Sequence, residues 1–208
     1  MPEPTMLANR CMMRPTWALM SHAYNQYKHP GFGVCWSGSG LDRDDEDEFD
    51  RRGRPKNIRY RNQCAVRMSV ALERCGFSLN AFGSRLDAPS NRGRGRRVHR
   101  GRSGCRLDVP HVLGAAELAR YLEAMWSTTR EFRGRSGARD AFAALSGCRG
   151  IIYFNDCFRR ANGSAGDHID LWDGSEYWNQ KLGISAGGGL EARANLFNRS
   201  NAVKFFVL

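Results

Sequence analysis

The spacing of hydrophobic residues changes along this chain, and the change limits the folds that it can adopt. Up to Leu145, apolar residues recur every three or four positions, as on one face of a helix. From Gly150 on, they form a short apolar run, an alternating segment and an apolar C-terminal segment, which are typical of β-strands. Because helical segments come first and strands follow, the pattern predicts an α+β fold rather than a regular alternation of strands and helices.

The second predicted helix is the one with the clearest ends. Asn62 is a favourable N-cap, and Gly76 is a favourable residue just past the C-terminus, so Cys64 lies in the first helical turn. The predicted helices span residues 16–27, 63–75, 115–126 and 136–145, and the predicted strands span 150–154, 168–172 and 202–208.

The chain of 208 residues fits a single domain, residues 1–208, that carries loop insertions. The first insertion, near residues 40–61, has an acidic cluster followed by a basic one, which is typical of a solvated loop. The second, at residues 83–106, has no hydrophobic periodicity and holds seven arginines between residues 92 and 106. We expect both insertions to be loops.

An excess of basic residues indicates acidic partners. The 32 basic and 21 acidic residues give a net charge of +11, which favours nucleic acid, anionic lipid, cell-wall polymer or an acidic protein. The arginine-rich segment resembles RNA-binding segments in composition, but it contains no Phe, Tyr or Trp that would stack on bases. Nucleic acid is therefore not the partner that we favour.

Neither a metal site nor a cofactor site is predicted. The seven cysteines and five histidines form no CxxC or HExxH motif and are scattered along the chain, so we expect no metal ion and no cofactor. The first residues show no basic region that leads into an apolar one. We therefore expect no signal peptide, and work outside the cytoplasm would require delivery by a dedicated machine.

Cys64 and His168 together form the candidate catalytic pair. Backbone N–H groups at a helix start stabilise an anion and lower the pKa of a thiol, which makes Cys64 a candidate nucleophile. Taken singly, Cys64 also fits a small core residue, and His168 also fits a surface histidine. We expect the strand face of His168, Asp170 and Trp172 to be open to a groove, because the alternate residues face the core. A cysteine at a helix start with a later histidine on a strand is the arrangement of papain-like cysteine hydrolases.

Three short motifs follow one another along the chain. They are Cys-x-x-Arg-Met-Ser at residues 64–69, Gly-Ile-Ile at 150–152 and His-x-x-Leu-Trp-x-Gly at 168–174. In sequence and in order, these motifs resemble the fourth family of type VI secretion amidase effectors. The resemblance spans roughly residues 15–208, and the two insertions are not part of the family pattern.

The resemblance implies a papain-like amidase of the NlpC type, an α+β fold in which helices pack on a small antiparallel sheet. Such effectors cleave peptidoglycan stem peptides between D-glutamate and diaminopimelate, and they use no cofactor. The type VI secretion machinery injects them into the periplasm of competing bacteria. An immunity protein in the producing cell plugs the active-site groove.

By position, the resemblance makes Cys64 the nucleophile and His168 the general base. The family's third residue is an acid eleven positions after the histidine, and Asn179 stands there in this chain. An amide oxygen can also accept the imidazole N–H, as in Cys-His-Asn enzymes, so Asn179 is the expected third residue. Asp170, on the strand face of His168, is the main alternative, and Asp173 is a weaker one.

The oxyanion hole is expected to combine the backbone N–H of Cys64 with a nearby donor such as Gln63 or Asn62. Gln63 and Trp172 are the candidates for binding the oxyanion and the substrate. Two other functions stay open at this point: a cysteine hydrolase or deamidase that acts on proteins, and a basic module that binds nucleic acid or anionic glycan. The presence of both Cys64 and His168 argues against the binding module.

Overall fold

The fold is that of a computed structural model of the chain. The residues that it describes are 14–25, 36–37, 58–59, 64–79, 98–99, 111–112, 114–126, 129–159, 165–178 and 192–208. Among these residues, no helix is long and apolar enough to cross a membrane. Most of both predicted insertions lies outside the described residues.

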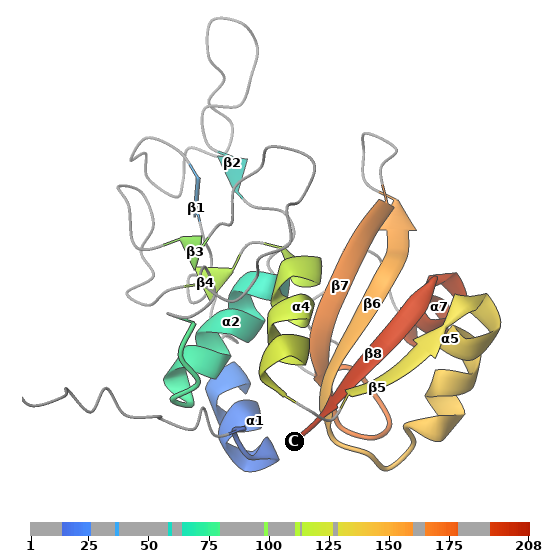
Figure 1. The fold of residues 1–208 in the computed structure, drawn as a ribbon, viewed down its shortest axis with the longest axis horizontal. Helices are drawn as coiled ribbons and strands as arrows, with labels where there is room; N and C mark the ends of the chain where they lie inside the picture. The colour runs from blue at the N-terminus through green and yellow to red at the C-terminus, as the bar shows by residue number, and fades with distance from the viewer. Residues whose placement is uncertain are drawn as a thin grey trace, which may run out of the picture.

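An antiparallel sheet of four strands forms the centre of the described fold (Figure 1). Its strands lie in the order β5 (Thr129–Arg133), β8 (Ala202–Val207), β6 (Gly150–Arg159) and β7 (Ala165–Trp172). β8 and β6 are therefore the inner strands, and β5 and β7 are at the edges. The edge position of β7 leaves one side of that strand available to a helix, a loop or a ligand.

Helices cover both faces of the sheet (Figure 1). α2 (Cys64–Arg74) and α4 (Ala115–Met125) lie on one face, and α1 (Trp17–Asn25) packs against α2. α5 (Gly134–Ala144) and α7 (Ala192–Arg199) lie on the other face.

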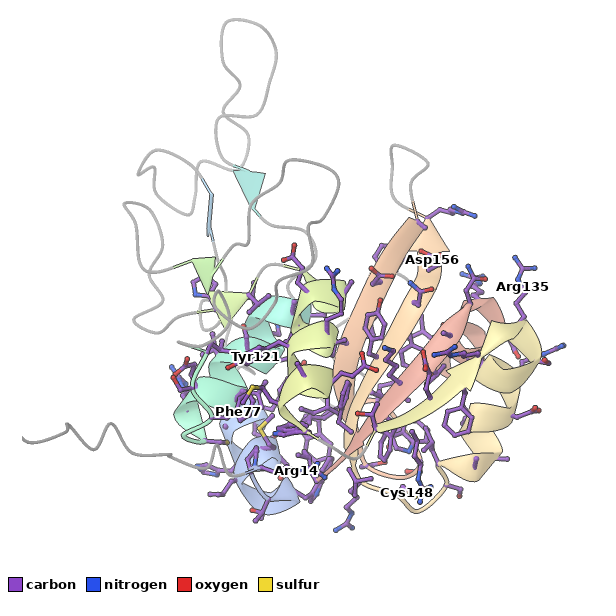
Figure 2. The ribbon with its side chains drawn as sticks, viewed as in Figure 1. Arg14, Phe77, Tyr121, Arg135, Cys148 and Asp156 are labelled. Atoms are coloured by element: carbon purple, nitrogen blue, oxygen red, sulfur yellow. The ribbon has the colours of Figure 1, made fainter. Side chains whose placement is uncertain are left out.

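Each face of the sheet buries its own apolar core, because both sets of alternating side chains are covered. On the α2 side, the rings of Phe77 and Tyr121 meet edge to face with centroids 5.8 Å apart (Figure 2). On the α5 side, Trp172 and Phe197 meet in the same way at 5.6 Å. The prediction that this face of β7 is open to a groove is therefore wrong for Trp172. This residue is buried under α5 and α7.

Two short strand pairs lie outside the main sheet. β1 (Trp36–Ser37) pairs with β2 (Ile58–Arg59), and β3 (Val98–His99) pairs with β4 (His111–Val112). β3 lies inside the predicted arginine-rich loop, so that segment contains a short strand that the lack of periodicity did not indicate.

The predicted α+β class, with helices on a small antiparallel sheet, is confirmed. All four predicted helices and all three predicted strands are present, although β6 and β7 are longer than the patterns indicated. β5 was not predicted, because most side chains of this edge strand are exposed and carry no alternating apolar pattern. α7 was not predicted either, so the helices do not all precede the strands.

The C-terminus of α2 confirms the predicted role of Gly76. This glycine has a φ of 83°, its N–H donates to Glu73 O at 2.9 Å, and the N–H of Phe77 donates to Leu72 O at 3.0 Å. This pair of bonds is a Schellman motif, which glycine favours because it has no Cβ. The proposed N-cap, Asn62, lies outside the described residues.

Candidate active site

Cys64 is the first residue of α2 and lies against the edge strand β7. Only 9% of the residue is exposed. The backbone N–H groups of Ala65 and Ile169 donate hydrogen bonds to its sulfur, and the His168 side chain hydrogen-bonds to it as well. The edge position of β7 is what allows a strand amide to point at a helix residue instead of at another strand.

His168 projects from β7 and is only 7% exposed. We expected an open strand face here, but the histidine is enclosed between Cys64 and Asp170. Asp170 is fully buried, and its Oδ2 lies 3.4 Å from His168 Nε2. Its Oδ1 accepts the backbone N–H of Leu171 at 2.8 Å. The structure thus brings Cys64, His168 and Asp170 together in one buried row.

The pKa of Cys64 is lowered and that of His168 is raised, and both shifts favour an ion pair. Burial alone raises the pKa of the Cys64 thiol, but the hydrogen bond and charge of His168 and the two backbone N–H groups outweigh it and lower the pKa below its ordinary value. Burial alone lowers the pKa of His168, but Asp170 and Cys64 outweigh it and raise the pKa to about 10. Between these two pKa values, the pair is a thiolate facing an imidazolium.

Such a pair can carry out acyl transfer. The thiolate is the nucleophilic form of cysteine, and an imidazolium beside it can donate a proton to a leaving group. The carboxylate of Asp170 lies beside the imidazole, with its Oδ2 3.4 Å from His168 Nε2, where a carboxylate can orient the ring. Gln63 and Asn179 lie outside the described residues.

A comparison with known protein families identifies the family of this chain. A family model for "Tae4: Type VI secretion system (T6SS), amidase effector protein 4" matches residues 60–206, most of the chain. The chain belongs to the Tae4 family. All three motifs of the sequence analysis lie within the match, and a Tae4 protein is a type VI secretion amidase effector.

Among solved structures, the chain is similar to one described as the effector–immunity system Tae4/Tai4 from Salmonella typhimurium. The two chains share 15% sequence identity, the match covers 94% of this chain and 99% of that one, and the TM-score is 0.48. No curated protein sequence matches this chain.

Several residues of the Tae4 motifs support the site without facing it. The Ser69 hydroxyl donates to Val66 O at 3.0 Å and accepts the N–H of Val112 at 2.9 Å, which ties β4 to α2. Gly150 must lack a side chain, because a Cβ there would come within 2.2 Å of Phe206 O. The motifs therefore specify packing as well as chemistry.

Trp172 does not have the substrate-binding role that we expected. It is 1% exposed, and its Nε1 donates to Leu145 O at 2.9 Å. With its only donor used and its ring surrounded by other aromatic rings, it anchors β7 to the α5 layer. Asp173 is occupied too, because its Oδ1 accepts the N–H of Ser175 and the N–H of Glu176, each at 2.9 Å.

The other described cysteines are poor nucleophiles or lie away from the site. Burial raises the pKa of Cys75 to about 11 and raises that of Cys157 further. All four described cysteines are free, and Cys148 lies at the opposite end of β6 from Asp156 (Figure 2). In the described part of the chain, no group of three or more His, Cys, Asp or Glu side chains could hold a metal ion.

Proposed function

We propose that this Tae4 protein is a cysteine-dependent amidase that hydrolyses peptidoglycan stem peptides between D-glutamate and diaminopimelate. The observation that carries the proposal is the buried row of Cys64, His168 and Asp170 in a chain of an amidase effector family. A papain-like reaction needs no metal or cofactor, because the thiolate and the imidazolium supply the nucleophile and the acid.

In the proposed reaction, Cys64 Sγ attacks the carbonyl carbon of the amide bond. His168 gives its proton to the leaving nitrogen as the carbon–nitrogen bond breaks, and an acyl thioester stays on Cys64. His168 then takes a proton from water, and the resulting hydroxide attacks the thioester. The acid product leaves, and the thiolate and imidazolium are restored. The backbone N–H of Cys64, with Gln63 as a neighbouring donor, would stabilise the oxyanion.

We propose Asp170 as the residue that orients the histidine. Its Oδ2 is near His168 Nε2, which leaves Nδ1 for proton exchange with Cys64 and the substrate. Two residues that are two apart on a strand stand side by side, so this contact requires Asp170 to lean along β7. Asn179, at the family's position, is the competing candidate, and exchange of each residue separates the two assignments.

As an effector, the protein would act outside the cell that makes it. We propose that the type VI secretion machinery delivers it to the periplasm of target bacteria, where the stem peptides are. We also propose that a cognate immunity protein inhibits it in the producing cell. The Salmonella structure, which is described as an effector–immunity system, is the precedent for that partner.

Purified protein incubated with diaminopimelate-type sacculi tests the proposal directly. Mass analysis should find stem fragments that are cut after D-glutamate, and the Cys64→Ala variant should release none. In addition, the protein should lyse bacteria when a signal sequence directs it to the periplasm and be tolerated in the cytoplasm. Intact sacculi, or toxicity confined to the cytoplasm, would favour a protein-modifying or nucleic-acid-directed activity.

A further inference from the structure

β6 and β7 lose their register immediately beside His168. They pair without interruption from Gly150 opposite Trp172 to Phe154 opposite His168. Pairing resumes at Phe158 opposite Gly166, so residues 155–157 of β6 face Asp167 alone. Bulges of this kind often lie next to active sites, where they redirect a side chain.

The side chain of Asp167 holds this bulge. Its Oδ1 accepts the backbone N–H of Asp156 at 2.9 Å and the Nδ2 of Asn155 at 3.2 Å. Asp156 needs such support, because its φ of 52° lies in the left-handed region that non-glycine residues rarely adopt. Figure 2 shows Asp156 toward the end of the β6–β7 pair, away from Cys148.

Asn201 holds the bulge from the other side of β6. Its Nδ2 donates to Asp156 Oδ2 at 3.0 Å, and its backbone N–H donates to Asn155 O, also at 3.0 Å. The extra residues are thus fixed from β7 and from the residue that precedes β8. The bulge therefore has one defined position in the sheet.

The position of the bulge determines where His168 stands. Phe154 opposite His168 is the last in-register pair before the bulge, and Asp167 is the residue next to the histidine. A bulge at another position along β6 would change the backbone path beside His168 and the β6 residue that pairs with it. The imidazole would then lose its position beside Cys64.

We propose that Asp167 is a positioning residue for His168, and that it acts by locking the bulge through its Oδ1. The inference rests on the proposed function only in the role that it gives to His168. Because both hydrogen bonds reach the same oxygen, an asparagine at position 167 keeps an acceptor for each of them. Hydrogen-bond geometry and negative charge can therefore be separated by substitution.

The test compares Asp167→Ala and Asp167→Asn with a control, Glu73→Ala. Glu73 also accepts a backbone N–H through its carboxylate, that of Leu79, but it lies at the end of α2 away from Cys64. Each protein is alkylated with iodoacetamide over a series of pH values, and mass mapping measures the modification rate of Cys64. Steady-state kinetics on a stem peptide give kcat and KM.

We expect Asp167→Ala to move the pH midpoint of Cys64 alkylation upward and to lower kcat by roughly 10- to 100-fold, with little change in KM. Asp167→Asn should restore both values. Glu73→Ala should lower the melting temperature and leave the midpoint unchanged.

An unchanged midpoint in Asp167→Ala, or equal shifts in both Asp167 variants, would overturn the proposal. Alkylation requires no substrate, so the role of Asp167 and the proposed amidase function can fail separately. Wild-type protein that does not cut stem peptides but shows the shifts would refute the proposed function alone. Cleavage by the wild type with no shift would refute the role of Asp167 alone.

Discussion

The two ends of α2 each carry a cysteine, and their thiols differ in chemistry. Cys64 opens the helix and has a lowered pKa, whereas Cys75 follows its last residue and has a pKa raised to about 11. Burial raises the pKa of both thiols, so burial does not explain why their pKa values differ. The helix dipole acts in opposite directions at the two ends, favouring an anion only at the start. Donors that face the sulfur, above all His168, decide which thiol is reactive.

The strongest test of this contrast is removal of each thiol. Cys64→Ala should abolish hydrolysis of sacculi, because no other group can replace the thiolate, and Cys64→Ser should be nearly as inactive. Cys75→Ala should keep the wild-type rate. Mass analysis of released stem fragments measures both variants. Substantial activity in Cys64→Ala, or a large loss in Cys75→Ala, would reverse the assignment.

Removal of His168 should bring the pKa of Cys64, at the start of α2, closer to the raised pKa of Cys75 at its end. In His168→Ala, burial still raises the pKa of Cys64, but the hydrogen bond and charge of His168 no longer lower it. The pKa of the thiol should therefore rise. We expect kcat to fall by roughly 10⁴- to 10⁶-fold. Kinetics on a stem peptide measure the loss, and circular dichroism checks that the fold is kept. A loss of less than about tenfold would show that another group activates Cys64.

Exchange of the orienting residue should have a smaller effect and separate its two candidates. Asp170→Asn removes the charge beside His168 Nε2 and should lower kcat by up to roughly 10⁴-fold, the loss that follows when a triad aspartate becomes asparagine. Asn179→Ala should lose less. The opposite ranking of the two variants would assign the role to Asn179.

The pH dependence of kcat/KM should show the titration of both Cys64 and His168. Because the pKa of Cys64 is lowered, kcat/KM should fall in acid as the thiolate gains a proton. Because the pKa of His168 is raised to about 10, kcat/KM should also fall as the pH approaches that value and the imidazolium loses its proton. The Cys75→Ala profile should superimpose on that of the wild type. A rate that continues to rise above pH 10 would contradict the ion pair.

The sequence was sufficient for the parts of the fold that follow periodicity. The spacing of Ala65, Met68 and Leu72 predicts α2, and the helix places Cys64 at its start, as expected. The pairing of Cys64 with His168 was predicted from their positions, a cysteine at a helix start and a later histidine on a strand, and the family resemblance gave the same pair. Contacts such as that between Cys64 and the Ile169 amide depend on strand order, which periodicity does not contain.

Other features could not be predicted because tertiary packing decides them. Alternation places Trp172 on the face of His168, but α5 and α7 cover that face and bury the indole. A bulge interrupts no hydrophobic period, so nothing in the sequence marked Asp167 as its anchor. β5 is an edge strand with mostly exposed side chains, so its sequence has no apolar alternation from which a strand could be predicted.

The most direct test of the central claim is the pH dependence of alkylation at the two ends of α2 in one sample. Iodoacetamide labelling followed by mass mapping gives separate rates for Cys64 and Cys75. Cys64 should have a midpoint below the ordinary thiol value of 9.0, and Cys75 should have one near 11. In His168→Ala, the Cys64 midpoint should rise while that of Cys75 stays fixed. A Cys64 midpoint at or above that of Cys75 in the wild type would contradict the account.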